Sequence, residues 1–285
     1  MPAPLCDRLF ASLPLTDAAR AARVRERIGP APFEAWGEGA RFLDAVFAAA
    51  PYLGRLAAQR RDTLEALGQN SPEAVLAAAR QAALQAGALE DEAAVMTALR
   101  EAKADLHLAA ALADLAGAFT LENTVEAISD FADAAVKAAL QAAARLSGLP
   151  ADDPDNPVPG LFVLTLGKHG QRSLNYSSDV DLAVFWEPDT LRAPPGKDPV
   201  RALDRLVKRM VHILNETTAH GYVFRIDLRL RPDPSSTPLA VNAEMARHYF
   251  EAVGQNWERA AYAKARACAG DGEAAAAFLK DLEPF

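Results

Sequence analysis

The sequence predicts an α+β protein, in which a mostly helical N-terminal part precedes a smaller α/β part. Alanine dominates the first half of the chain, and alanine is the strongest helix former but is rare in strands. The segment 148–160 then holds four prolines and two glycines, which breaks the helical pattern. Beyond it, short apolar runs bounded by turn residues alternate with helical patterns, as expected for strands and helices together.

Length and composition limit the function classes. The 285 residues are enough for more than one domain, and the formal net charge of −8 argues against a nucleic-acid partner. The two cysteines, Cys6 and Cys268, are too few for a zinc site and are typical of reduced thiols. No run of about 18 apolar residues or signal peptide is present, so we expect a cytoplasmic protein with no membrane segment.

The helices of residues 1–150 are predicted from apolar residues at helical spacing. Ser71, Pro72 and Glu73 supply an N-cap, a first-turn proline and an early acid for a helix that runs to about Gly87. We expect the helices to pack as a bundle. The other helical segments are 33–49, 51–67, 91–116 and 121–147.

Residues 151–285 are predicted to form the α/β part and to end in a helix. The runs LFVLTL and VDLAVFW have the composition and length of buried strands, and YVFRIDLRL alternates apolar and polar residues as a third strand does. Gly221 is a suitable helix stop before that third strand. The predicted strands are 161–166, 180–186 and 222–230, and the predicted helices are 199–219 and 242–267.

Acidic residues on two of these strands form the candidate site. Asp179 and Asp181 are two residues apart, so they share one face of their strand. On the third strand, Asp227 lies between Arg225 and Arg229 on the face opposite the apolar residues. If the two strands are neighbours, the three carboxylates converge.

Converging carboxylates raise each other's pKa unless a cation offsets their charge. Hard oxygen ligands of this kind suit Mg²⁺ or Mn²⁺, and two such ions can polarise a phosphorus centre. Gly167 would let the backbone approach a phosphate, Ser178 is placed to donate to one, and Arg225 and Arg229 would neutralise anionic oxygens. Lys168 in the glycine turn is as well explained by a solvated loop as by a phosphate contact.

Each feature also has a plainer explanation. A D-x-D pair is more often a solvated strand edge, and alternating arginines and aspartates can be an ordinary ion-paired surface. The order of the features favours a site: a strand, a glycine turn, a serine before D-x-D on a second strand, and an acid on a third. Together they favour metal-dependent nucleotidyl transfer.

This order resembles the DNA polymerase β-type nucleotidyltransferase superfamily. More specifically, GKHGQRSLNYSSDVDL resembles the signature of the glutamine synthetase adenylyltransferase/adenylyl-removing enzyme family. FRIDLRLRPDPSSTPL, YFEAVGQNWERAAYAKARACAGD and the upstream segment 99–140 resemble further blocks of that family in the same order. The resemblance covers roughly residues 95–272 and implies a polymerase β-like α/β domain with a short mixed sheet.

The resemblance also implies an activity. Enzymes of this family have two similar catalytic halves: one removes AMP from a tyrosine of glutamine synthetase by phosphorolysis, releasing ADP, and the other attaches AMP from ATP. The run LNYSSD resembles the first half, so we expect deadenylylation that regulates nitrogen assimilation, in a truncated piece of that half. By position, Asp179, Asp181 and Asp227 would bind the metal, and Gly167 and Ser178 would contact phosphate.

Two departures from the signature leave the loop conformation open. Gln171 and Ser173 stand where the family usually has a glycine and a glutamate. Two alternatives to deadenylylation also stay open. The chain could transfer AMP from ATP to glutamine synthetase, or it could be a non-catalytic docking module for the synthetase or for a PII-type signal protein.

Overall fold

The structure is a computed structural model that describes residues 2–149, 151, 153–191 and 198–283. Helices dominate, and the strands form one small mixed sheet, which confirms the α+β prediction. The chain divides into two compact units: one combines residues 1–81 with 101–128, and the other combines 82–100 with 129–285. The predicted boundary at residue 150 lies outside the described residues.

The first unit is helical and is built around buried aromatic side chains. Trp36 is fully buried; its indole nitrogen donates to the Leu64 carbonyl oxygen at 2.7 Å, and its ring stacks on Phe42. The predicted helix 33–49 is broken at Gly37, which has a φ of +50°. The helices that begin in this unit are α1 (Ala18–Ile28), α2 (Pro30–Trp36), α3 (Ala40–Ala49), α4 (Pro51–Gln59), α5 (Arg61–Gln69) and α6 (Pro72–Ala86), with short 3₁₀ turns at Leu5–Asp7 and Gly37–Gly39.

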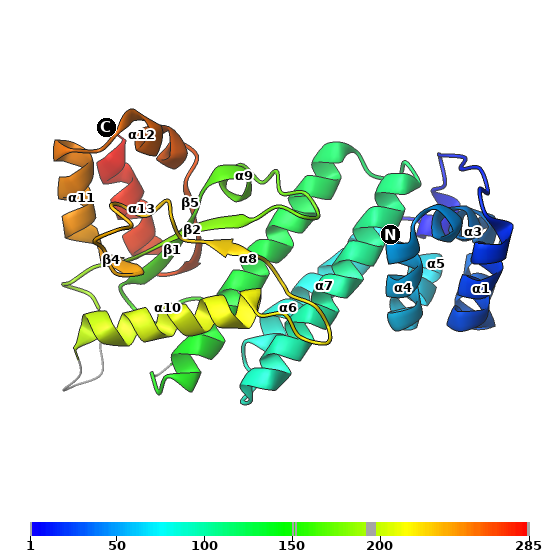
Figure 1. The fold of residues 1–285 in the computed structure, drawn as a ribbon, viewed down its shortest axis with the longest axis horizontal. Coiled ribbons are helices and arrows are strands. Elements are labelled where there is room, and N and C mark those ends of the chain that lie inside the picture. Colours follow the sequence, from blue (N-terminus) through cyan, green and yellow to red (C-terminus); the bar gives the residue numbers. More distant parts are fainter. Residues whose placement is uncertain (1, 150, 152, 192–197, 284–285) are drawn as a thin grey trace. The chain divides into compact units, whose positions relative to one another are not determined.

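Two long helices, α7 (Glu92–Leu115) and α8 (Leu121–Leu146), contribute to both units and confirm the two longest predicted helices. The second unit holds the sheet, which is shown in Figure 1. Its strands are β1 (Leu161–Thr165), β2 (Val180–Trp186), β3 (Ile226–Asp227), β4 (Ala240–Asn242) and β5 (Arg266–Gly270), and its remaining helices are α9 (Gly167–Gly170), α10 (Pro199–Asn215), α11 (Ala243–Ala252), α12 (Asn256–Tyr262) and α13 (Gly272–Leu282).

The sheet order is β3-β2-β1-β5, and β4 also pairs with β2. β1 is antiparallel to β2 and β5, whereas β3 and β4 run parallel to β2 at opposite ends of its free edge. Because β1 and β2 are antiparallel, the end of β1 lies beside the beginning of β2. This arrangement brings the glycine turn next to the paired aspartates.

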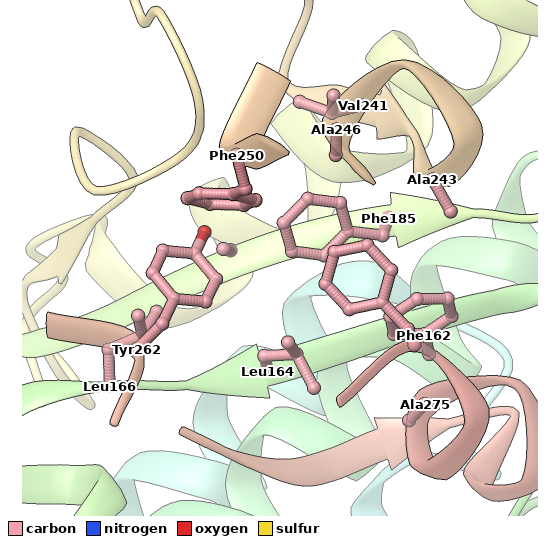
Figure 2. Packing of buried hydrophobic residues seen from close by; sticks show 12 residues of the cluster. Phe162, Leu164, Leu166, Phe185, Val241, Ala243, Ala246, Phe250, Tyr262 and Ala275 are labelled. Carbon is pink, nitrogen blue, oxygen red and sulfur yellow. The ribbon is translucent and has the colours of Figure 1, made fainter. Parts of the chain in front are cut away.

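An apolar cluster on one face of the sheet fixes its position (Figure 2). Phe162 and Phe185 from neighbouring strands have ring centroids 5.6 Å apart, and Phe278 of α13 packs 4.6 Å from Phe185. Phe250 and Tyr262 close the cluster from α11 and α12. Offset and tilted aromatic contacts add to the free energy gained by burying these large rings. The central strands are therefore anchored by a buried aromatic core, and the candidate site lies at their ends.

Two predicted elements are wrong in extent. The third strand covers two residues instead of nine, because the carboxylate of Asp227 accepts a bond from the Arg229 backbone N–H at 2.8 Å and turns the chain. Before the strand, the Val223 and Phe224 N–H groups both donate to the Leu214 carbonyl. The predicted helix 199–219 ends at Asn215, ahead of Gly221.

The predicted helix 242–267 is also wrong. It is two helices, α11 and α12, separated where the Val253 and Gly254 N–H groups both donate to Tyr249. The chain then forms β5, whose sequence RACAG gives almost no strand signal because alanine and glycine disfavour strands. Arg266, expected at a helix end, pairs instead with Thr165 in the sheet. No helix in the described part of the chain is both long and apolar enough to cross a membrane.

Candidate active site

Asp181 is the central residue of the candidate site. It is the one residue of β2 that is partly exposed, and it pairs in parallel register with Asp227 of β3. On the other side, the Leu166 N–H donates to the Asp181 carbonyl at 3.0 Å, so the glycine turn begins beside it. The sheet therefore places Asp181 between the glycine turn and Asp227, because β2 and β3 are the neighbours that the convergence of the carboxylates required.

Gly167 satisfies two constraints at once. Its φ is +54°, a backbone conformation that residues with a side chain rarely adopt. A Cβ atom built on it would collide with Oδ2 of Asp181. The turn therefore needs glycine both for its conformation and for its approach to the carboxylate.

The surroundings of Asp181 raise the pKa of its carboxyl group. Burial raises its pKa above the ordinary value, and the nearby charges of Asp227 and Asp179 raise it further. The flanking acids are instead paired with arginines. Arg225 Nε lies 2.5 Å from Asp179 Oδ1, and Arg229 Nη2 lies 2.5 Å from Asp227 Oδ2.

The two arginines form ion pairs with the flanking aspartates and lower the pKa of Asp227. Bonds from Arg229 lower the pKa of Asp227 despite its partial burial. Arg225 also donates to the Ser177 carbonyl and to the Tyr222 hydroxyl, so it links the loop before β2 to the segment before β3. Within the residues that the structure describes, no group of three or more His, Cys, Asp or Glu side chains is arranged so that it could hold a metal ion.

The donor set nevertheless has the chemistry of a divalent-cation site. Asp181 is crowded by negative charge that the more distant Arg229 only partly offsets, and it forms no ion pair within the described residues, so added positive charge would relieve it. Its neighbours supply carboxylate oxygens, the ligands that Mg²⁺ and Mn²⁺ prefer. Asp179 and Asp227 would have to exchange their arginine partners for the ion.

The other predicted phosphate contacts are placed differently. The Ser178 hydroxyl donates to Asn175 Oδ1 at 3.0 Å and accepts from the Asn175 N–H, so it closes its own turn. Lys168 is exposed, and its ammonium group has no ion-pair partner among the described residues. Ser173 donates from its N–H and its hydroxyl to the Lys168 carbonyl, which fixes the loop after the turn.

A pocket of about 530 Å³ opens beside the two acid–arginine pairs. It is lined by both members of each pair and by residues that sequence reasoning missed: Lys208 and Val211 of α10 and Leu239 before β4. Lys208 adds a cation to the pocket wall and forms an ion pair with Asp204 at 2.8 Å. Helical periodicity places Lys208 on the polar face of α10, but it gives no sign that this face borders the pocket.

The chain matches the family model described as glutamate-ammonia ligase adenylyltransferase over residues 41–281. It is similar to the bifunctional glutamine synthetase adenylyltransferase/adenylyl-removing enzyme of Caulobacter vibrioides, with 44% identity over 99% of this chain and 29% of that protein. The enzyme of the same description from Mesorhizobium japonicum is 46% identical over 95% of this chain and 28% of its own length.

The chain thus spans less than a third of the length of these curated relatives. The family match covers most of this chain, including the glycine turn, the three aspartates and the pocket. This chain belongs to the glutamate-ammonia ligase adenylyltransferase family.

Proposed function

We propose that this chain removes AMP from adenylylated glutamine synthetase, using phosphate to split the bond between AMP and a tyrosine and releasing ADP. The observation that carries the proposal is the position of Asp181 between the glycine turn and Asp227. Strand pairing places a backbone turn that can approach a phosphate beside carboxylates suited to divalent cations. The relatives' description includes both addition and removal of adenylyl groups.

The direction of the reaction is inferred from the loop that leads into β2. Its run LNYSSD resembles the adenylyl-removing half of the family, and its last residue, Asp179, lines the pocket. Removal of AMP would restore the unmodified synthetase, so the reaction would regulate nitrogen assimilation. Glutamine synthetase is accordingly the proposed protein substrate, with inorganic phosphate as the second substrate.

Asp181 and Asp227, joined by Asp179, would hold Mg²⁺ or Mn²⁺. A divalent ion at these carboxylates supplies positive charge that stabilises the phosphoryl oxygens and the departing tyrosine oxygen. The chain's own cations then become available. When Arg225 and Arg229 leave their aspartates, both guanidinium groups remain on the pocket wall, where they can bind the oxygens of phosphate or AMP.

Positioning is the main contribution of the protein in this proposal. An oxygen of inorganic phosphate attacks the α-phosphorus as the bond to the tyrosine oxygen breaks, and the new bond makes ADP. The arginines and Lys208 would hold the anionic reactants in line for this displacement. The buried sheet beneath Asp181 keeps the acids in place while the reactants exchange.

The test incubates the 285-residue chain with adenylylated glutamine synthetase, Mn²⁺ and phosphate, and measures ADP by chromatography. We expect ADP release that Asp181→Asn reduces by about 10²-fold or more. Asp189→Asn is a matched control, because Asp189 is exposed beyond the other end of β2. Equal ADP release by the wild type and by Asp181→Asn would overturn the assignment.

Two further readouts separate the alternatives. Transfer of labelled AMP from ATP to unmodified glutamine synthetase would indicate the adenylylating reaction. Binding to the synthetase or to a PII-type protein, with neither ADP release nor AMP transfer, would indicate a docking module.

A further inference from the structure

A second charged cluster, formed by Asp133, His169 and Arg266, packs against the glycine turn and takes no part in the proposed chemistry. Asp133, in the middle of α8, accepts two bonds from the guanidinium of Arg266 at 2.7 and 2.9 Å. The His169 Nε2 atom lies 2.7 Å from the same carboxylate. These residues come from α8, α9 and β5, so the cluster joins three elements that are distant in sequence.

The cluster holds the turn through its backbone as well as its side chain. Arg266 Nη2 donates to the His169 carbonyl oxygen at 3.2 Å, and the His169 side chain is fully buried. Burial alone raises the pKa of Asp133, but the contacts from His169 and Arg266 lower it below its ordinary value. The acid therefore remains charged inside a cluster that is tied to the turn on both sides.

Further contacts fix the rest of the loop to the same helix. The Leu174 N–H donates to the buried Ser129 hydroxyl at 3.2 Å, and Arg172 forms an ion pair with Asp130. A Cβ atom at Gly170 would collide with the Lys264 carbonyl, so the turn also sits directly on the chain before β5. These contacts attach the loop after β1 to one face of α8.

The turn needs such support because its own structure is weak. It is a single helical turn of four residues with glycine at both ends, and glycine loses more conformational freedom on folding than any other residue. Its position nevertheless determines how closely the backbone at Gly167 approaches the Asp181 carboxylate. A shift of a fraction of an ångström here would change the space available to a phosphate group.

We propose that Asp133 and Arg266 form a positioning clamp that grips His169 and thereby sets the glycine turn against Asp181. Neither residue lines the pocket, so the clamp acts through the turn and not on the reactants. The inference rests on the proposed function for its kinetic consequence, but its structural consequence can be measured in the free protein. Supporting contacts of this kind typically change affinity or rate by about 10–100-fold when they are removed.

The structural test follows backbone hydrogen exchange by mass spectrometry in the whole chain without substrates. Asp133→Asn keeps the size of the side chain and removes its charge, and we expect exchange in 166–174 to rise about tenfold or more while β2 stays protected. Arg266→Lys keeps the charge but loses the two-pronged geometry, so it should give a smaller increase. Lys137→Gln, on the same helix, removes an exposed ion pair with Asp155 and should leave 166–174 unchanged.

The kinetic test measures ADP release at varied phosphate concentration, corrected for the folded fraction. We expect Asp133→Asn to raise KM for phosphate about tenfold with a smaller change in kcat. The separate variant Arg266→Lys should raise KM less. If exchange in 166–174 is unchanged in both variants, the clamp is wrong. If the wild type releases no ADP but exchange rises as expected, the proposed function fails and the clamp stands. Where Asp133→Asn does not fold, Arg266→Lys decides on the same two readouts.

Discussion

Two acid–arginine arrangements in the same unit have opposite surroundings. Asp179–Arg225 and Asp227–Arg229 line an open pocket, and the Arg229 side chain is 85% exposed. Asp133–Arg266 lies beneath the glycine turn, where both side chains are at most one quarter exposed. Pairs with an exposed arginine contribute little to stability and exchange partners readily, whereas pairs in which both side chains are largely covered are costlier to break. The comparison supports the proposal that the pocket pairs exchange their partners for ligands and that the Asp133 cluster positions the glycine turn.

The largest expected effect is on activity at the pocket. Asp227→Asn should lower kcat/KM for ADP release by about 10²–10³-fold, because a carboxylate facing Asp181 is lost from the charged site. The unfolding midpoint should change little, since Arg229 returns to solvent. A comparable fall in both activity and stability would show that Asp227 mainly stabilises the fold. It would then behave like Asp133, and the contrast between the two arrangements would be wrong. Asp189→Asn is again the control.

The next effect is on stability at the partly buried cluster of Asp133, His169 and Arg266. Asp133→Ala should reduce the free energy of unfolding by about 3 kcal/mol, because it leaves the Arg266 guanidinium and the His169 ring without the carboxylate that both contact. Urea denaturation followed by circular dichroism measures this change. The loss should persist at 1 M salt, where exposed ion pairs are screened. A loss that disappears with salt would show that the cluster behaves as a surface pair.

Asp181 gives a smaller effect of the opposite sign. Its folded-state pKa is raised above 3.8, so its ionised form destabilises the fold at neutral pH. Asp181→Asn should therefore stabilise the protein without divalent ions by about 0.5 kcal/mol at pH 7 after solvent screening. The gain should shrink as the pH falls through the folded-state pKa and vanish once the pH is well below the unfolded-state value of 3.8. Thermal unfolding in EDTA across this range is the measurement, and a loss of stability at pH 7 contradicts the prediction.

The smallest effect is expected at the exposed arginine. Arg229→Gln should leave the unfolding midpoint within measurement error of the wild type at any salt concentration. Calorimetric titration with Mn²⁺ should show tighter binding than in the wild type, because Asp227 no longer has a competing cation. Weaker Mn²⁺ binding would indicate that Arg229 orients the carboxylate instead of competing for it.

Sequence reasoning succeeded where the signal was local. The residues of β2 were predicted from a run that is apolar except for Asp181, and those of β1 from a similar run before Gly167. The long helices followed from apolar spacing, and Ser71 caps α6 through a bond from the Ala74 N–H. The same local pattern placed Asp179 and Asp181 near the entry of one buried strand.

It failed where distant residues decided the outcome. β5, with the sequence RACAG, forms where it pairs with the edge of β1, which is about 100 residues away in the chain. The early end of β3 is a local exception, because the Asp227 carboxylate accepts a bond from the Arg229 N–H two residues on. Lys208 reaches the pocket because of how α10 packs, and the helical spacing of its sequence does not reveal that packing. Pairing of the aspartates with arginines had been the plainer explanation of the alternating pattern, and the structure pairs Asp179 with Arg225 and Asp227 with Arg229.

By itself, the sequence determined the helical character of the chain, its two central strands and the acids that they carry, because helix and strand periods are read from neighbouring residues. Tertiary structure alone decided that Asp181 faces Asp227 in register and that Asp133 meets Arg266 across 133 residues of chain. Such contacts depend on which elements pack together, and the burial of apolar surface between whole elements sets that choice.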